Sequence, residues 1–266
     1  MKRRILAMGA LLGLAAASAQ AQDSAAAGIA KFREMLADGN PAELFEMKGE
    51  DLWKQKRGPK NVSLEQCDLG LGPGVVKGAF VQLPKYFADT GKVQDLETRL
   101  VTCMEKLQGF DAATLYKTPY GKGEQVTLTA LATWIGGESK GMRFSVTADN
   151  KHMADMYEVG KRLFFHRAGP HDFSCATCHG QDDKRIRLQD LPNLTKNPGD
   201  GVGFAAWPAY RISNSEMWPM QKRLNDCYRQ QRFPEPKWGS DATIALSVYM
   251  GVNAKGAESI VPALKR

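Results

Sequence analysis

The sequence predicts an all-α protein made of two related helical domains in tandem, and two observations support this. Several residues of the N-terminal part recur in the C-terminal part in the same order and at equal spacing. Each part also closes with an apolar stretch of helical length that ends at a glycine, at residues 128–136 and 244–251. A shared order over several residue types is the sign of an internal repeat.

The repeat is clearest around a proline, an arginine and a cysteine. Pro84, Arg99 and Cys103 match Pro208, Arg223 and Cys227. In both copies the proline precedes the arginine by 15 residues and the cysteine by 19. Upstream, Gly49, Leu52 and Cys67 match Gly160, Leu163 and Cys175. We therefore expect domains at residues 40–142 (the first half) and 150–256 (the second half), with a polar linker near 148–151 and a tail at 257–266 that packs on a surface or frays.

The N-terminus reads as a secretory signal. Residues 2–4 are basic, residues 5–17 are apolar, and residues 19–21 are Ala-Gln-Ala, the small-x-small pattern that precedes cleavage. We expect cleavage after Ala21 and a periplasmic location. An uncleaved N-terminal anchor is the alternative.

The charge of the chain limits its partners. The net charge is +7 over 266 residues, and three of those charges lie in the signal, which leaves +4. This mild excess suits an anionic partner or substrate. Because basic runs with interleaved aromatic residues are lacking, we expect no nucleic-acid binding. No other apolar stretch approaches the roughly 18 residues of a membrane span.

The segment Cys175-Ala-Thr-Cys178-His179 has the pattern of covalent haem attachment. Two thiols add to the haem vinyl groups, and the adjacent histidine binds the iron as the proximal ligand. A redox CxxC and half of a zinc site are the alternatives, but the chain has no second CxxC and no thioredoxin-like pattern around this one. We expect one covalently bound haem c and two cytochrome c-like domains, of which only the second holds haem.

The first half lacks the residues that hold such a haem. Gly70 stands where the second half has Cys178, and Leu71 stands where it has His179. A thioether cysteine and the proximal ligand are therefore both missing, so this half cannot bind a c-type haem in the usual way.

Two cysteines of the first half, Cys67 and Cys103, are then left without a metal in an oxidising compartment. A disulfide between them is the simplest outcome. It closes a 36-residue interval and contributes roughly 3–4 kcal/mol in the chain-entropy model. Two free buried thiols are the alternative. With two cysteines on haem and two in a disulfide, Cys227 is the odd one.

Cys227 is a candidate for the distal iron ligand, because its repeat partner Cys103 lies where such a ligand would arise in the first half. A buried thiol on a helix is the plain alternative. Methionine is the usual partner of histidine in small cytochromes c. The competing candidates are Met217, Met220, Met250 and His171.

Arg223 lies four residues before Cys227 and, on a helix, one turn away on the same face. A guanidinium there favours a thiolate and can hold a small anion. It can instead pair with a haem propionate or with a carboxylate such as Asp226 or Glu216. Arg99 persists in a half without haem, so a packing or capping role must be part of the explanation.

Six segments together carry a family resemblance that covers essentially the whole mature chain. They are residues 65–70, 83–90, 99–104, 175–180, 207–211 and 223–227. In combination they resemble the SoxA family, the larger cytochrome subunit of the SoxAX complex of periplasmic thiosulfate oxidation. Gly70 and Leu71 depart from the two-haem pattern, so the chain resembles the single-haem branch, with a disulfide in place of the first haem.

This resemblance implies an enzyme, an L-cysteine S-thiosulfotransferase. Cys227 would be both the distal ligand and the catalytic cysteine, often a persulfide in the family, and Arg223 would bind thiosulfate. The reaction joins thiosulfate to a cysteine of a SoxYZ-like sulfur carrier as a cysteine S-thiosulfonate. Two electrons leave through haem to a small monohaem, SoxX-like cytochrome. The alternatives are a simple electron-transfer cytochrome with His179/Met ligation and a non-catalytic scaffold subunit.

Overall fold

The computed structural model describes residues 27–28, 31, 34–35, 39–186, 189–196 and 203–265. The expected signal peptide, residues 1–21, lies outside the described residues.

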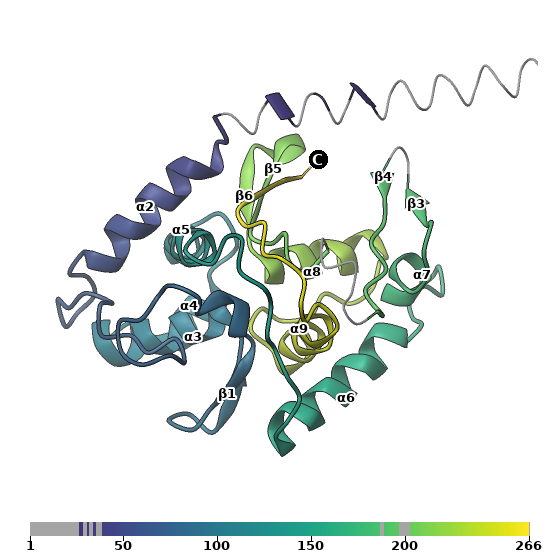
Figure 1. Ribbon diagram of the computed structural model, residues 1–266. Helices are drawn as coiled ribbons and strands as arrows, with labels where there is room; N and C mark the ends of the chain where they lie inside the picture. The colour runs from purple at the N-terminus through teal and green to yellow at the C-terminus, as the bar shows by residue number, and fades with distance from the viewer. Residues whose placement is uncertain are drawn as a thin grey trace, which may run out of the picture.

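Helices form most of the regular structure (Figure 1). The α-helices are α2 (Ala42–Lys54), α3 (Leu96–Cys103), α4 (Ala112–Lys117), α5 (Glu124–Gly137), α6 (Lys151–Phe165), α7 (Cys175–His179), α8 (Met220–Gln230) and α9 (Asp241–Asn253). Shorter helical turns are η1 (Phe80–Gln82), η2 (Met104–Gln108) and η3 (Ile212–Asn214). Among the described residues, none of these helices has the length and apolar character needed to cross a bilayer.

Two crossed helix pairs, α2 with α5 and α6 with α9, organise the two halves (Figure 1). Glycine makes each close crossing feasible. A Cβ added at Gly49 would overlap the carbonyl of Ala130, and one added at Gly160 would overlap the carbonyl of Ala245. Interdigitation of this kind needs a small residue where the two backbones approach most closely. Gly49 and Gly160, which match in the repeat, therefore lie at equivalent helix crossings in the two halves.

The structure also contains small sheets, so the all-α prediction is right for the main elements and incomplete. The strands are β1 (Lys85–Phe87), β2 (Lys92–Gln94), β3 (Arg185–Ile186), β4 (Gln189–Asp190), β5 (Ala209–Arg211), β6 (Glu216–Trp218) and β7 (Ala263–Lys265). They form the pairs β1-β2 and β3-β4 and the three-stranded sheet β6-β5-β7. Strands of two or three residues are too short to produce a period-two sequence pattern, which is why the sequence did not predict them.

The repeat extends to these strands. The hairpin β1-β2 and helix α3 recur as β5, β6 and α8, with every strand boundary and the start of the helix displaced by 124 positions. In the hairpins Tyr86 pairs with Val93, and Tyr210 pairs with Met217. The prolines before the first strands, Pro84 and Pro208, both follow cis peptide bonds.

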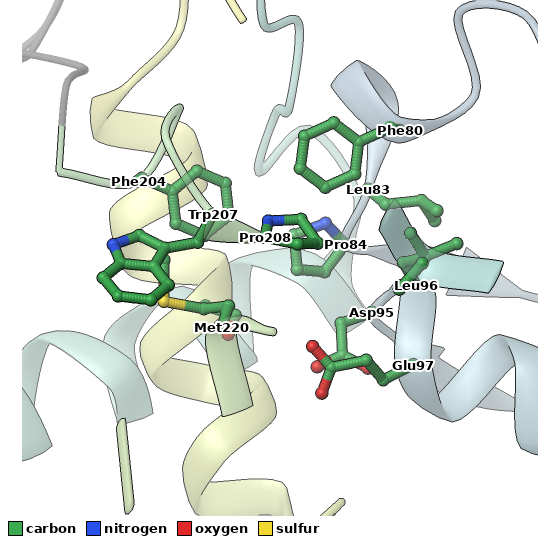
Figure 2. A pocket seen from close by; sticks show the side chains of 12 residues that line it. Phe80, Leu83, Pro84, Asp95, Leu96, Glu97, Phe204, Trp207, Pro208 and Met220 are labelled. Carbon is green, nitrogen blue, oxygen red and sulfur yellow. The ribbon is translucent and has the colours of Figure 1, made fainter. Parts of the chain in front are cut away.

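The starts of α3 and α8 meet between the two halves. Asp95 caps α3 through the backbone N–H of Thr98 and accepts a 2.6 Å hydrogen bond from the Nε2 of Gln221 on α8. Beside it, Glu97 accepts from the backbone N–H of Gln221. Pro84 and Pro208 line a cavity of about 30 Å³ next to this junction. The side chains of Asp95 and Glu97 lie at its edge (Figure 2).

The C-terminal tail is part of the fold. The backbone N–H of Ser259 donates to the carbonyl of Met142, Val261 is fully buried, and β7 pairs in parallel with β5. The tail was expected either to pack on a surface or to fray, and over these residues it packs.

In the first half, Cys67 and Cys103 form a disulfide with their Cα atoms 5.5 Å apart. Both cysteines are buried, at 1% and 5% exposure. The two free thiols considered as the alternative are therefore absent from this half.

Candidate active site

The CxxCH segment forms the short helix α7, and its own residues cap it. Ser174 and Thr177 form a capping box, in which each side chain bonds the backbone N–H of the other residue. The cap residue Ser174 lies one position before the first cysteine, so the helix begins at Cys175. One helical turn then places Cys175, Cys178 and His179 as neighbours, since residues three and four apart share a face.

His179 has a fixed ring orientation. Its Nδ1 lies 2.9 Å from the carbonyl oxygen of Pro192. A carbonyl only accepts, so Nδ1 carries the proton and Nε2 keeps a free lone pair. Burial lowers the pKa of His179, and the nearby Arg223 lowers it further, while the Pro192 carbonyl opposes them. The ring is therefore a neutral imidazole, the form that binds a metal.

Cys227 is the free cysteine of helix α8. It is half-buried, and burial raises the pKa of its thiol, with the neighbouring Cys178 adding to the effect while Arg223 and Arg211 oppose it. Burial, followed by the effect of Cys227, raises the pKa of Cys175 to about 12. These mutual effects place Cys227 within electrostatic range of Cys175 and Cys178.

The other candidates for the distal ligand have different surroundings. Met220 lines the cavity between the halves, beside Trp207 (Figure 2). Met217 is buried in β6, and Met250 is buried in the main core on α9. His171 is exposed, with its ring 5.6 Å from that of Phe173.

Arg223 pairs with a carboxylate of its own helix. Its Nη1 donates to Asp226 at 3.0 Å, and its guanidinium lies 5.6 Å from the ring centroid of Trp207. Asp226 also accepts from Arg229 and Gln230, so its charge is shared among three donors. Of the two carboxylates considered from the sequence, Asp226 is the partner. Glu216 accepts from Lys222 and Trp218 instead.

Arg211 is a site residue that the sequence reasoning missed. It lies on β5, its guanidinium is 5.1 Å from the ring centroid of Trp218, and its Nε has no hydrogen-bond partner among the described residues. Burial lowers the pKa of Arg211, and Arg223 lowers it further, while Cys227 opposes. The 124-residue offset between the halves could have drawn attention to Arg211, because it aligns this charged residue with the apolar Phe87.

The donors around α7 fit a haem of the c type. Thioether attachment needs two thiols three residues apart, and two axial ligands can come from a free imidazole nitrogen and from a third sulfur, that of Cys227 on α8. Within the described residues, no group of three or more His, Cys, Asp or Glu side chains is arranged to hold a separate metal ion.

Comparison with known proteins agrees with this donor set. The family model "SoxA/TsdA, cytochrome c domain" matches residues 48–144, which include the disulfide. The L-cysteine S-thiosulfotransferase subunit SoxA of Hydrogenophilus thermoluteolus is 54% identical over 273 aligned positions, covering the whole of both chains. The chain belongs to the SoxA family.

Other SoxA relatives extend the similarity. A SoxA of Hydrogenobacter thermophilus is 32% identical over 97% of this chain and 96% of its own. The crystal structure of SoxXA from P. pantotrophus matches with a TM-score of 0.73 and 25% identity, over 89% of this chain and 84% of that one. The SoxA fold therefore covers both halves described above.

Proposed function

We propose that this SoxA-family chain acts as an L-cysteine S-thiosulfotransferase subunit that conjugates thiosulfate to a cysteine of a SoxYZ-like sulfur carrier. The family membership supports the reaction class. The observation that supports the assignment of the site is the place of Cys227 on α8, one turn after Arg223 and within electrostatic range of the α7 thiols and Arg211.

One haem c occupies the second half in this proposal. Cys175 and Cys178 would hold it by thioether bonds, and His179 Nε2 and Cys227 Sγ would bind its iron. When bound, the haem supplies an acceptor for single electrons close to the reacting sulfur atoms. The first half carries a disulfide at the matching cysteines and no CxxCH segment, which supports a single haem.

Arg223 and Arg211 bind the thiosulfate dianion. Asp226 neutralises one positive charge of this cluster and is itself bonded by three donors, so the cluster keeps a positive excess toward Cys227. A planar guanidinium binds oxyanions through two parallel hydrogen bonds. The arginines thus orient the sulfonate group and leave the outer sulfur of thiosulfate directed to the thiol side of the site.

The overall reaction joins two sulfur atoms and must release electrons. The carrier thiol and thiosulfate form a cysteine S-thiosulfonate, one proton and two electrons, which balances both charge and atoms. A small SoxX-like cytochrome c takes the electrons, in keeping with the similarity to SoxXA. The remaining parts of the proposal are a periplasmic location, signal cleavage after Ala21, and domains at residues 40–142 and 150–256.

Low-temperature EPR of the oxidised haem in the purified mature protein tests the site. We expect a low-spin signal with the narrow g-spread of histidine–thiolate ligation. In Cys227→Ala this signal is lost together with transferase turnover, while the haem stays covalently attached. Met220→Leu is the matched control and leaves the spectrum unchanged. A wide histidine–methionine signal in the wild type would instead assign the chain as an electron carrier.

A further inference from the structure

Helix α8, which carries Arg223, has a proline where its counterpart α3 has a capping residue. By the 124-residue offset, the cap residue Asp95 of α3 corresponds to Pro219, the residue before α8. Asp95 accepts from the backbone N–H of Thr98, whereas the side chain of Pro219 has no polar atom to offer. The first backbone N–H groups of a helix have no partner within the helix. The start of α8 therefore depends on groups from other parts of the fold.

Gln221, the second residue of α8, makes the contacts that hold this start. It is fully buried, at 0% exposure. Its Nε2 donates to Oδ2 of Asp95 at 2.6 Å, and its Oε1 accepts from the backbone N–H of Gly239 at 2.8 Å. Its backbone N–H donates to Oε1 of Glu97 through a longer bond of 3.4 Å. Two carboxyl groups of the first half thus hold the first turn of α8.

The repeat explains why an amide stands at this position. Glu97 and Gln221 are each the second residue of their helices, so equivalent positions of the two halves meet at the junction. Asp95 is already the cap of α3 and can only accept while it is ionised. A second glutamate at position 221 would set one carboxyl group against another. The amide of Gln221 instead donates to Asp95 and leaves its own oxygen for Gly239.

We propose that Gln221 is a positioning residue for Arg223, and that through it the first half sets the place of the arginine that binds substrate. Arg223 lies two residues further along α8. Its guanidinium is 5.6 Å from the ring centroid of Trp207. Trp207 and Met220, the first residue of α8, line the cavity at the junction (Figure 2). Because both supports of Arg223 start from this junction, a shift of the first turn of α8 displaces the guanidinium, and small displacements of an orienting group are costly.

Gln221→Met tests the proposal, since methionine keeps the unbranched shape of the side chain and removes its two hydrogen bonds. We expect kcat/KM for thiosulfate to fall about tenfold, with haem content unchanged. Gln108→Met is the matched control, because Gln108 is also 0% exposed and its Nε2 donates to the carbonyl of Val62 within the first half. The control should have a lowered Tm and the kcat/KM of the wild type. Equal kinetic losses in the two variants, or wild-type kinetics in Gln221→Met, would overturn the proposal.

A second experiment exchanges the donor and the acceptor of the 2.6 Å bond. Gln221→Glu alone sets its carboxyl group against that of Asp95 and should lower kcat/KM for thiosulfate. Adding Asp95→Asn supplies an amide that donates to the new carboxylate, while its Oδ1 still caps α3. The double variant should therefore regain most of the wild-type kcat/KM. A double variant with the Tm of the wild type and the kinetics of Gln221→Glu would contradict the positioning role.

The Arg223→Ala background separates this inference from the proposed function, on which it rests. If Gln221 acts through Arg223, Gln221→Met should cause no further loss of kcat/KM in a chain that already lacks Arg223. A full additional loss there would overturn the proposal. A defect in Arg223→Ala together with normal kinetics in Gln221→Met defeats the inference alone. Normal kinetics in Arg223→Ala defeats the proposed substrate site and the inference with it.

Discussion

The two halves carry an arginine at matching positions, Arg99 and Arg223, in contrasting surroundings. In the first half Arg99 is 4% exposed, its Nε donates to the carbonyl of Asp68 at 2.6 Å, and its Nη1 pairs with Asp89 at 2.9 Å. Its guanidinium lies 4.0 Å from the ring centroid of Phe87. Its charge is paired, and its Nε and Nη1 are bonded, within this half.

The second half changes the residues around the matching Arg223. Arg211 stands where the first half has Phe87, and Ser213 stands where it has Asp89. One acidic partner is lost and one guanidinium is gained on the same scaffold. The comparison teaches that the half with the disulfide pairs its arginine internally, whereas the other half keeps positive charge available near Cys227.

The largest expected effect comes from removing Arg223. In Arg223→Ala we expect turnover to fall roughly hundredfold, about 3 kcal/mol in transition-state stabilisation, because a preorganised charged donor is lost. Haem content and Tm should stay near those of the wild type, and Arg223→Lys should recover part of the activity. Steady-state kinetics with thiosulfate and the carrier measure this. Unchanged turnover would remove Arg223 from the substrate site.

The matching change in the first half should affect folding alone. In Arg99→Ala we expect a loss of roughly 2–3 kcal/mol in the free energy of unfolding, because the carboxylate of Asp89 and the carbonyl of Asp68 lose the buried guanidinium that they bind. The KM for thiosulfate should not change. Chemical denaturation and steady-state kinetics measure the two quantities. A kinetic defect with full stability would contradict the division of roles between the halves.

Giving the second half the residue of the first tests Arg211. In Arg211→Phe we expect the KM for thiosulfate to rise about tenfold, near 1.4 kcal/mol, with a smaller effect on kcat. Lys54→Gln, which removes one exposed charge from α2, is the control and should leave KM unchanged. If haem content falls while KM holds, Arg211 serves the haem carboxylates and not the substrate.

The smallest effect concerns the junction between the halves. Burial raises the pKa of Glu97 well above 4.5, and the charge of Asp95 adds to this. The folded state therefore keeps a proton that the unfolded state releases, so stability falls as pH rises from about 4.5 toward the folded pKa. Glu97→Gln should remove this slope. Denaturation of both chains between pH 4 and pH 8 checks it, and parallel curves would contradict it.

Much of this organisation is visible in the sequence because it depends on local patterns. The CxxCH segment, the crossing glycines and the equal spacing around Arg99 and Arg223 are all local or periodic signals. They predict the helix pairs, the covalent cofactor and the pairing of Cys67 with Cys103. Each of these features needs only the identity and separation of residues along the chain.

The features that the sequence did not predict depend on contacts between distant segments. The carbonyl of Pro192, which orients His179, is a backbone group that any residue supplies. Arg211 reaches the site because three-residue strands place it there. The bonds from Gln221 to Asp95 join residues 126 positions apart. No periodicity within one segment reports such a contact.

The strand that carries Arg211 has a neighbour from the very end of the chain. β5 pairs with β6 on one side and with β7 on the other, where Arg211 is in register with Lys265. The sheet at the site is thus complete only when residues 263–265, which follow every other described element, have joined it. A purification tag fused close after Lys265 would adjoin this strand, so tags for kinetic work belong elsewhere on the chain.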